Sequence, residues 1–258
     1  IQLDIMEFYP SITEKILDDA ILFAKQYIDI SEEDHTIIKH CRKSLLYYED
    51  NPWKKKESEN CFDVTMGSYD GAEICELIGI YILSKLSTVV APENSGLYRD
   101  DGLILLRNVN GQKMDNIRKK IIAIFKEVGF KIEIQTNLKI VDFLDVTFNL
   151  NNNTYKPYRK PNDNLLYINS SSNHPPQVII QLPRSIAERL SNNSSNEQVF
   201  NLAKPSYEKA LNDSGFSDIN LKYNARKDDK KVKNRNRKVI WFNPPFNKHV
   251  QTMLQKNS

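Results

Sequence analysis

The chain has 258 residues, of which 40% are hydrophobic and 27% are charged, values that fit a globular protein with a sizeable buried core. Its net charge of +3 gives only weak support for a polyanionic partner, and no apolar run reaches the roughly 20 residues that a membrane helix needs. The three cysteines form no CxxC pair and have no His at ligand spacing, so we expect no disulfide framework or zinc site, but an intracellular protein, nuclear or cytoplasmic and not secreted.

The first predicted element is a short strand over residues 1–5, which is apolar except for Asp4. Pro10 ends this extended segment. Residues 11–14 (SITE) then fit a capping box, in which the serine hydroxyl and the glutamate carboxylate satisfy free amide groups at a helix start. Apolar residues at helical spacing predict that this helix is amphipathic and reaches Tyr27.

Two polar segments separate this helix from the next long one. Residues 31–60 are charged and contain an Asn-Pro pair, so they predict a helix followed by a surface loop. Residues 62–71 predict a second loop, which leads into a helix whose apolar face recurs from Ile74 to Ile82.

A β-hairpin is predicted where two apolar runs, residues 97–98 and 103–106, flank residues 99–102 (RDDG). A third amphipathic helix over residues 117–128 follows, and Gly129 is expected to end it as a left-handed cap. Three short strands are expected next, around residues 131–134, 139–141 and 146–150.

The composition changes near residue 150, beyond which Asn, Ser and Pro become frequent. A polar, helix-rich region runs from about residue 183 to residue 211. We therefore predict an α+β domain over residues 1–150 and a mostly helical region over residues 151–258.

Two segments of the second region are basic. Residues 155–160 (YKPYRK) mix cations with aromatic rings, and residues 226–238 are densely basic. Both could contact phosphates, and the first could also stack on bases. The alternative is an ordinary strand or loop for the first segment and a solvated tail for the second.

Three aspartates stand out against their apolar surroundings. Asp100 and Asp101 are adjacent at the predicted hairpin tip, where their repulsion is costly unless a cation offsets it, although a solvated tip also fits them. Asp4 adds a carboxylate from an apolar strand, and the intervening helices would let that strand pair with the hairpin. Carboxylate oxygens suit Mg²⁺, and because strand neighbours face opposite sides, one of the adjacent pair must be the principal ligand.

Two Mg²⁺ ions held by Asp4, Asp100 and Asp101 would support nucleotidyl transfer, and Mn²⁺ could substitute for them. One ion would lower the pKa of a primer 3′-hydroxyl, and the other would neutralise a triphosphate and the leaving pyrophosphate.

Four short segments follow one another along the chain: LDIMEFYPSI at residues 3–12, MGS at 66–68, YRDD at 98–101 and FLDV at 143–146. In this order they resemble the motifs of reverse transcriptases, and within them the Penelope-like or a related retroelement group. Residues 158–161 (YRKP) are similar to the segment beyond the palm in that group. The resemblance implies a right-hand polymerase palm, an antiparallel sheet backed by helices, followed by a thumb-like helical region.

The resemblance also assigns roles to single residues. Asp4, Asp100 and Asp101 would be the catalytic metal ligands. Tyr9 would be a steric gate beneath the nucleotide sugar and Phe8 a further nucleotide-binding residue, although a core aromatic also fits Tyr9. Gly67 would let the backbone approach the nucleotide, and Lys139 would protonate pyrophosphate unless it is a solvated strand lysine. The implied nucleic-acid contacts are Tyr98, Tyr158, Arg159 and Lys160.

The implied activity is that of an RNA-directed DNA polymerase, with an RNA template, a DNA primer and dNTP as partners. The family's fingers segment and nuclease domain are not in this chain, and residues 66–71 (MGSYDG) lack a Ser-Pro pair that many relatives carry. We therefore expect a palm and thumb fragment that could be inactive alone. The alternative is a retroelement remnant acting at most as a nucleic-acid-binding module; an RNA-dependent RNA polymerase or a carboxylate nuclease is less favoured by a bulky gate.

Overall fold

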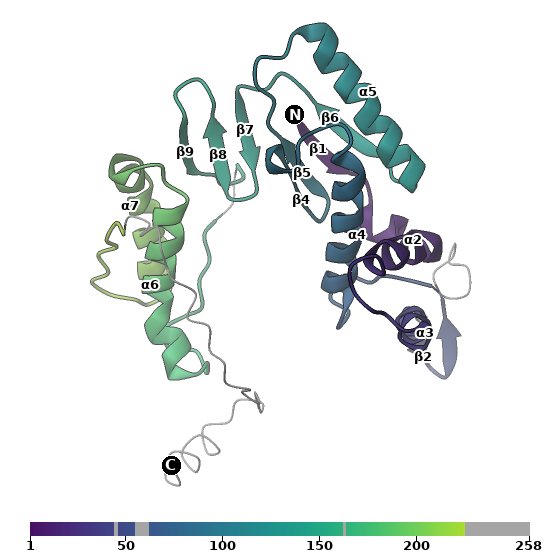
Figure 1. Cartoon of the computed structure of the whole chain (residues 1–258). Coiled ribbons are helices and arrows are strands. Elements are labelled where there is room, and N and C mark those ends of the chain that lie inside the picture. The colour runs from purple at the N-terminus through teal and green to yellow at the C-terminus, as the bar shows by residue number, and fades with distance from the viewer. Residues whose placement is uncertain (44–45, 55–61, 162–163, 225–258) are drawn as a thin grey trace. The chain divides into compact units, whose positions relative to one another are not determined.

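The computed structural model describes residues 1–43, 46–54, 62–161 and 164–224. It is a mixed α+β structure with antiparallel sheets, which confirms the predicted class (Figure 1). The chain divides into two compact units, Ile1–Leu138 and Lys139–Ser258. The predicted boundary near residue 150 falls instead in a turn of the second unit's sheet, so that sheet belongs with the helices that follow it.

The first unit is built on a four-stranded antiparallel sheet with the strand order β4-β5-β1-β6 (Figure 1). Its strands are β1 (Gln2–Ile5), β4 (Ser95–Tyr98), β5 (Asp101–Ile104) and β6 (Ile132–Gln135). Because β1 and β4 are both antiparallel to β5, they run in the same direction with β5 between them, a split β-α-β arrangement. Helix α4 (Gly71–Leu86) belongs to the crossover, and α5 (Gly111–Val128) joins β5 to β6.

One face of this sheet is apolar and covered. Leu3, Ile5 and Ile104 are buried there, in one cluster with Ile78 of α4 and Phe125 of α5. Strand residues alternate between faces, so their neighbours in sequence lie on the opposite side. The covered face supplies the hydrophobic stabilisation, and the opposite face is left for polar groups.

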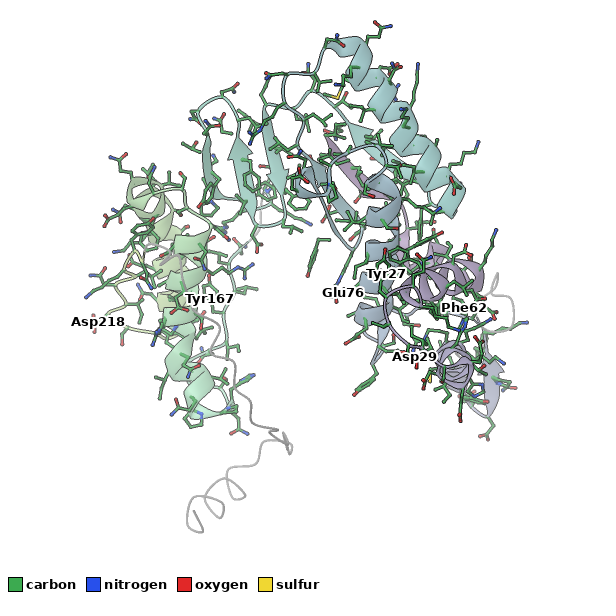
Figure 2. All side chains as sticks on the ribbon, viewed as in Figure 1. Tyr27, Asp29, Phe62, Glu76, Tyr167 and Asp218 are labelled. Atoms are coloured by element: carbon green, nitrogen blue, oxygen red, sulfur yellow. The ribbon has the colours of Figure 1, made fainter. Side chains whose placement is uncertain are left out.

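Three elements follow β1: the single turn α1 (Phe8–Ser11), α2 (Glu14–Ala24) and α3 (Glu32–His40). The predicted capping box at Ser11 is wrong, because Ser11 is taken up as the last residue of α1. Thr13 caps α2 instead, and its hydroxyl accepts a hydrogen bond from the amide of Ile16 at 3.3 Å. The helix also ends before Tyr27, which stands beyond it (Figure 2).

A β-hairpin occupies part of the segment where only a surface loop was predicted. Its strands are β2 (Leu46–Tyr48) and β3 (Asn51–Trp53). Glu49 and Asp50 both have a positive φ, 48° and 61°, as a tight two-residue hairpin turn requires. The sequence argued against a strand because Pro52 cannot donate a hydrogen bond to a sheet.

Helices α2 and α3 are joined through the carboxylate of Asp18. His35 Nε2 lies 2.8 Å from Asp18 Oδ1, and Lys39 Nζ donates to Oδ2 at 2.9 Å. Burial opposes ionisation, but the hydrogen bonds from Lys39 and His35 outweigh it and hold the pKa of Asp18 below its ordinary value of 3.8.

The lowered pKa of Asp18 predicts how stability depends on pH. A carboxylate with a depressed folded pKa contributes stability above its unfolded pKa of 3.8, and this is lost as the pH falls through the folded pKa. We expect Asp18→Asn to lower the free energy of unfolding by about 1 kcal/mol near neutral pH. Denaturant unfolding of both proteins should show the difference vanishing in strong acid; a difference that persists there would contradict the assignment.

The rest of the first unit follows the predicted order. A short 3₁₀ turn, η2 (Pro92–Asn94), precedes β4. Asn110 caps α5, and its side chain accepts from the amide of Lys113 at 2.8 Å. Gly129 ends α5 with a φ of 106°, which confirms the predicted left-handed cap.

In its described residues, 139–161 and 164–224, the second unit combines a three-stranded antiparallel sheet with two helices. Its elements are β7 (Ile140–Phe143), β8 (Val146–Asn149), β9 (Thr154–Pro157), α6 (Pro176–Asn192) and α7 (Glu197–Asp213). The predicted helix-rich region is confirmed, although α6 begins earlier than residue 183. Phe200 and Leu211 of α7 are fully buried against Ile186 and Leu190 of α6.

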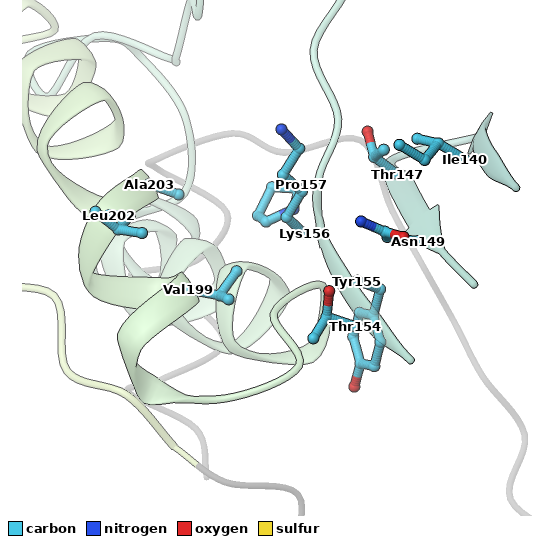
Figure 3. A pocket seen from close by; sticks show the side chains of 10 residues that line it. All are labelled: Ile140, Thr147, Asn149, Thr154, Tyr155, Lys156, Pro157, Val199, Leu202 and Ala203. Atoms are coloured by element: carbon cyan, nitrogen blue, oxygen red, sulfur yellow. The ribbon is translucent and has the colours of Figure 1, made fainter. Parts of the chain in front are cut away.

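A hydrogen bond and a pocket lie between the sheet and the helices of this unit. The amide of Ser195 donates to the carbonyl of Tyr155 at 3.0 Å, which ties the α6–α7 loop to β9. A pocket of about 440 Å³ separates the sheet from α7, with Lys156 on one wall and Leu202 on the other (Figure 3).

The basic segment 226–238 lies outside the described residues. Among the helices that the structure describes, none combines the length and the apolar character that a membrane span requires.

Candidate active site

The polar face of the first sheet gathers carboxylates in one row. In the register of the strands, Asp4 of β1 lies opposite Asp101 of β5 and, on its other side, opposite Glu133 of β6. Tyr98 of β4 extends the row beyond Asp101. Residues directly opposite one another in antiparallel strands share a face. The predicted pairing of the first strand with the hairpin is therefore confirmed.

The side chain of Asp4 is exposed on this face, yet its environment disfavours the charged form. Partial burial raises the pKa of Asp4 above its ordinary value of 3.8, and the negative charges of Asp100 and Glu133 raise it further. Like charges that face one another across strands destabilise a sheet. The row therefore carries an electrostatic cost that a bound cation would remove.

The hairpin turn is fixed by its backbone. The amide of Ile5 donates to the carbonyl of Asp100 at 2.9 Å, which joins the turn to β1. Arg99 adopts a positive φ of 56°, and its guanidinium lies 5.4 Å from the centre of the Tyr98 ring. The backbone of Asp100 is therefore tied to β1.

Gly102 allows the two strands to pack closely behind the carboxylates. A Cβ at this position would stand 2.5 Å from Leu3 Cδ1 and 2.6 Å from Leu3 Cγ. Any larger residue would push the side chain of Leu3 out of its place in the core. The glycine after the aspartate pair is thus required by packing.

The structure places Tyr9 and Phe8 differently. Tyr9 is half-buried, and its hydroxyl lies close enough to the thiol of Cys75 on α4 for the two groups to influence each other's pKa. Burial raises the pKa of Tyr9 above its ordinary value of 10.0, and Cys75 raises it further. The charge of Arg99 acts in the opposite direction. Phe8 is buried and packs 5.4 Å from the ring of Phe130. Its side chain belongs to the core, which corrects the prediction that it contacts a nucleotide.

Gly67 lies in the exposed loop before α4 with a φ of 87°, a backbone conformation that favours glycine. Arg42 is a buried residue that the sequence did not identify, and its side chain anchors this loop. Its guanidinium forms an ion pair with Asp70 and donates to Ser68 Oγ at 3.4 Å. Arg42 therefore anchors the loop, in which Gly67 is exposed to solvent.

Four other predicted site residues belong to the second unit. Lys139 has an exposed side chain, and its carbonyl accepts from the amide of Leu150 at 2.8 Å. Tyr158 and Arg159 are half-buried in a pocket of that unit, and Lys160 is exposed beside them. The structure thus brings Asp4, Asp100, Asp101, Tyr98 and Tyr9 together within the first unit, and it places Lys139, Tyr158, Arg159 and Lys160 in the second.

Sequence reasoning also missed Glu133 and Cys75. Glu133 is a charged position in the alternating run IEIQ of β6, and such alternation places it on the polar face of the sheet. Its position opposite Asp4 depended on a register that the sequence alone does not reveal. Cys75 lies on the apolar face of α4, where it has the pattern of an ordinary core residue.

The donor groups of this site fit Mg²⁺ or Mn²⁺ in type and charge, because they are carboxylate oxygens on an exposed face. Burial raises the pKa of the Cys75 thiol to about 11, so the neighbouring sulfur stays protonated and is a poor ligand. Within the described ranges, no three His, Cys, Asp or Glu side chains are already gathered as a group that could hold a metal ion. Binding of a metal is thus a proposal that rests on the carboxylate row.

No family model, curated protein or solved structure matches this chain. The function is therefore inferred from the geometry of the site and from the order of its motifs.

Proposed function

We propose that the chain is the palm and thumb-like part of a reverse transcriptase, which adds dNTP to the 3′-hydroxyl of a DNA primer on an RNA template. The observation that carries the proposal is the pairing of β1 with β5, which brings Asp4 beside the hairpin of Asp100 and Asp101 on an open sheet face. The open face offers a surface on which a primer end could lie.

Asp4 and Asp100 would be the main ligands of two Mg²⁺ ions, with Asp101 assisting. When bound, the ions supply Lewis acidity toward the primer hydroxyl and charge neutralisation of the triphosphate. The chain's own contribution is to hold the carboxylates on a rigid sheet. Partial burial and, after it, the negative charges of Asp100 and Glu133 raise the pKa of Asp4, and a bound cation would offset this cost of ionisation.

Tyr9 is suited to the steric gate that the resemblance implies. Its ring packs edge-on against Phe8 at 5.8 Å, and the side chain is half-buried next to Cys75. A gate must not swing away when a ribose 2′-hydroxyl presses on it, so an anchored ring discriminates better than a mobile one. Discrimination against ribonucleotides favours a DNA polymerase over an RNA polymerase.

A metal-binding measurement tests the proposal without requiring activity. We expect Mn²⁺ at about 100 times its dissociation constant to stabilise the wild-type chain by about 2.7 kcal/mol, measured as a shift of the melting temperature. Asp4→Asn should abolish most of this shift. In the absence of metal the same variant should melt above the wild type, because it removes one of the facing negative charges.

The matched control is Asp115→Asn on α5. Asp115 is an exposed carboxylate that pairs with Arg118 at 2.9 Å and with Lys119 at 2.8 Å, away from the carboxylate row. This variant should keep the full response to Mn²⁺. If wild type and Asp4→Asn respond equally, the metal site is refuted and the alternative, a non-catalytic nucleic-acid-binding remnant, is favoured.

A further inference from the structure

A second cluster of polar side chains lies in the second unit, around a pocket of about 450 Å³. It draws on the loop after β9, on α6 and on α7, and it includes Asp145 from the β7–β8 turn. Tyr167 packs alongside α6 within this unit (Figure 2). The charged and phenolic groups that line the pocket are Asp145, Tyr158, Arg159, Tyr167, Arg189 and Tyr207.

These groups are electrostatically coupled. Burial raises the pKa of Tyr167 to about 12, and the charges of Tyr207, Arg189 and Arg159 act on it as well. Burial also raises the pKa of Tyr207, on which Arg159, Arg189 and Asp145 act in turn. Both phenols therefore stay protonated at neutral pH and can donate hydrogen bonds. The pocket wall contains two guanidinium groups and one carboxylate.

The ion pair in this cluster is easily exchanged. Arg189 donates to Asp145 Oδ2 at 2.5 Å, but the two side chains are 69% and 56% exposed. An ion pair that is this exposed to water contributes little to stability. It orients the guanidinium but leaves it able to bind another anion. An incoming anion can share Arg189 or displace the carboxylate.

The donors of the pocket match a phosphate group better than a carboxylate. A phosphate offers more acceptor oxygens, and arginine binds it through paired hydrogen bonds. The remaining wall is apolar or aromatic: Leu166 is 87% exposed at its edge, and Tyr158 contributes a ring. Such surfaces accept a sugar or a base beside the phosphate.

We propose that this pocket binds the phosphate group of a nucleotide unit, with Arg189 and Arg159 as its cations and Tyr167 and Tyr207 as neutral donors. The site stands on the second unit alone and holds whether or not the carboxylate row of the first unit binds metal.

The test uses the full chain in EDTA, so that metal-dependent binding does not contribute. A fluorescent single-stranded oligonucleotide is titrated at several salt concentrations, and adenosine monophosphate is titrated separately by calorimetry. Arg189→Gln should make the negative slope of log K against log salt shallower by about 0.7, the value for one phosphate contact in a single strand. Asp145→Asn should change affinity in the opposite direction and tighten binding, because it removes the competing carboxylate.

Arg184→Gln is the matched control on the same helix. Arg184 is paired with Glu188 at 3.1 Å and lines a different depression that also includes Asp218. This variant should leave both titrations unchanged. Circular dichroism of the variants checks the fold, which the exposed position of Arg189 should preserve.

Each outcome decides the proposal. A shallower salt slope for Arg189→Gln supports a phosphate of a polynucleotide backbone. An unchanged slope with lost binding of adenosine monophosphate supports a free nucleotide. If Arg189→Gln alters neither titration, or alters them no more than Arg184→Gln, the proposal is overturned.

Discussion

Asp100→Asn is expected to reduce primer extension on an RNA template by at least about 10²- to 10³-fold, the loss seen when one preorganised electrostatic group is removed from an active site. Asn keeps the size of the side chain but removes the charge that would hold a metal. The contact that fixes the turn is made by the carbonyl of Asp100 to the amide of Ile5, so the substitution leaves it in place. We therefore expect a loss of activity without a loss of fold.

The measurement should use the chain expressed together with any coding sequence that precedes Ile1. Asp50→Asn is the control: Asp50 also stands in a two-residue hairpin turn, between β2 and β3. It should extend primers like the wild type, and both variants should give the wild-type circular dichroism spectrum. Undiminished extension by Asp100→Asn would remove the central support of the proposed function.

Ile78→Ala is expected to destabilise the first unit by about 2–5 kcal/mol, since it deletes fully buried methyl and methylene groups and leaves a cavity. Ile78 is 0% exposed on α4 and belongs to the cluster that covers the apolar face of the sheet. The backing of the carboxylate row would weaken with it. Urea unfolding followed by circular dichroism measures the change.

The same helix supplies the control. Ile80 lies two residues further along α4 and is 57% exposed, so Ile80→Ala makes the same chemical change at the surface. Its effect should stay within about 0.5 kcal/mol. Equal losses for the two variants would contradict the prediction, because Ala is the better helix former at both positions and only burial makes the loss larger at Ile78.

Local signals in the sequence were sufficient for the elements that carry their own pattern. The strand of Asp4, the hairpin at residues 99–102 and the cap at Gly129 were all predicted, because each depends on alternation or turn chemistry within a few residues. The start of α2 was not, since Ser11 and Thr13 are both good caps and only the extra turn α1 decides between them.

The missing parts of the site depend on contacts distant in sequence. Glu133 reaches Asp4 only through the register of β6, and Arg189 reaches Asp145 only after α6 has packed. The boundary near residue 150 was misplaced for a related reason. An Asn-rich hairpin turn has the composition of a linker, and only the pairing of β8 with β9 shows that the sheet continues across it.

The strand order β4-β5-β1-β6 has a consequence for synthesis of the chain. β1 leaves the ribosome before both of its partners, which are encoded about a hundred or more residues later. At roughly 5–20 residues per second, β1 waits on the order of 5–20 s with both edges unpaired. Until β5 and β6 emerge, Leu3 and Ile5 remain exposed to aggregation or to a chaperone. A nascent chain released before residue 101 could never assemble the carboxylate row.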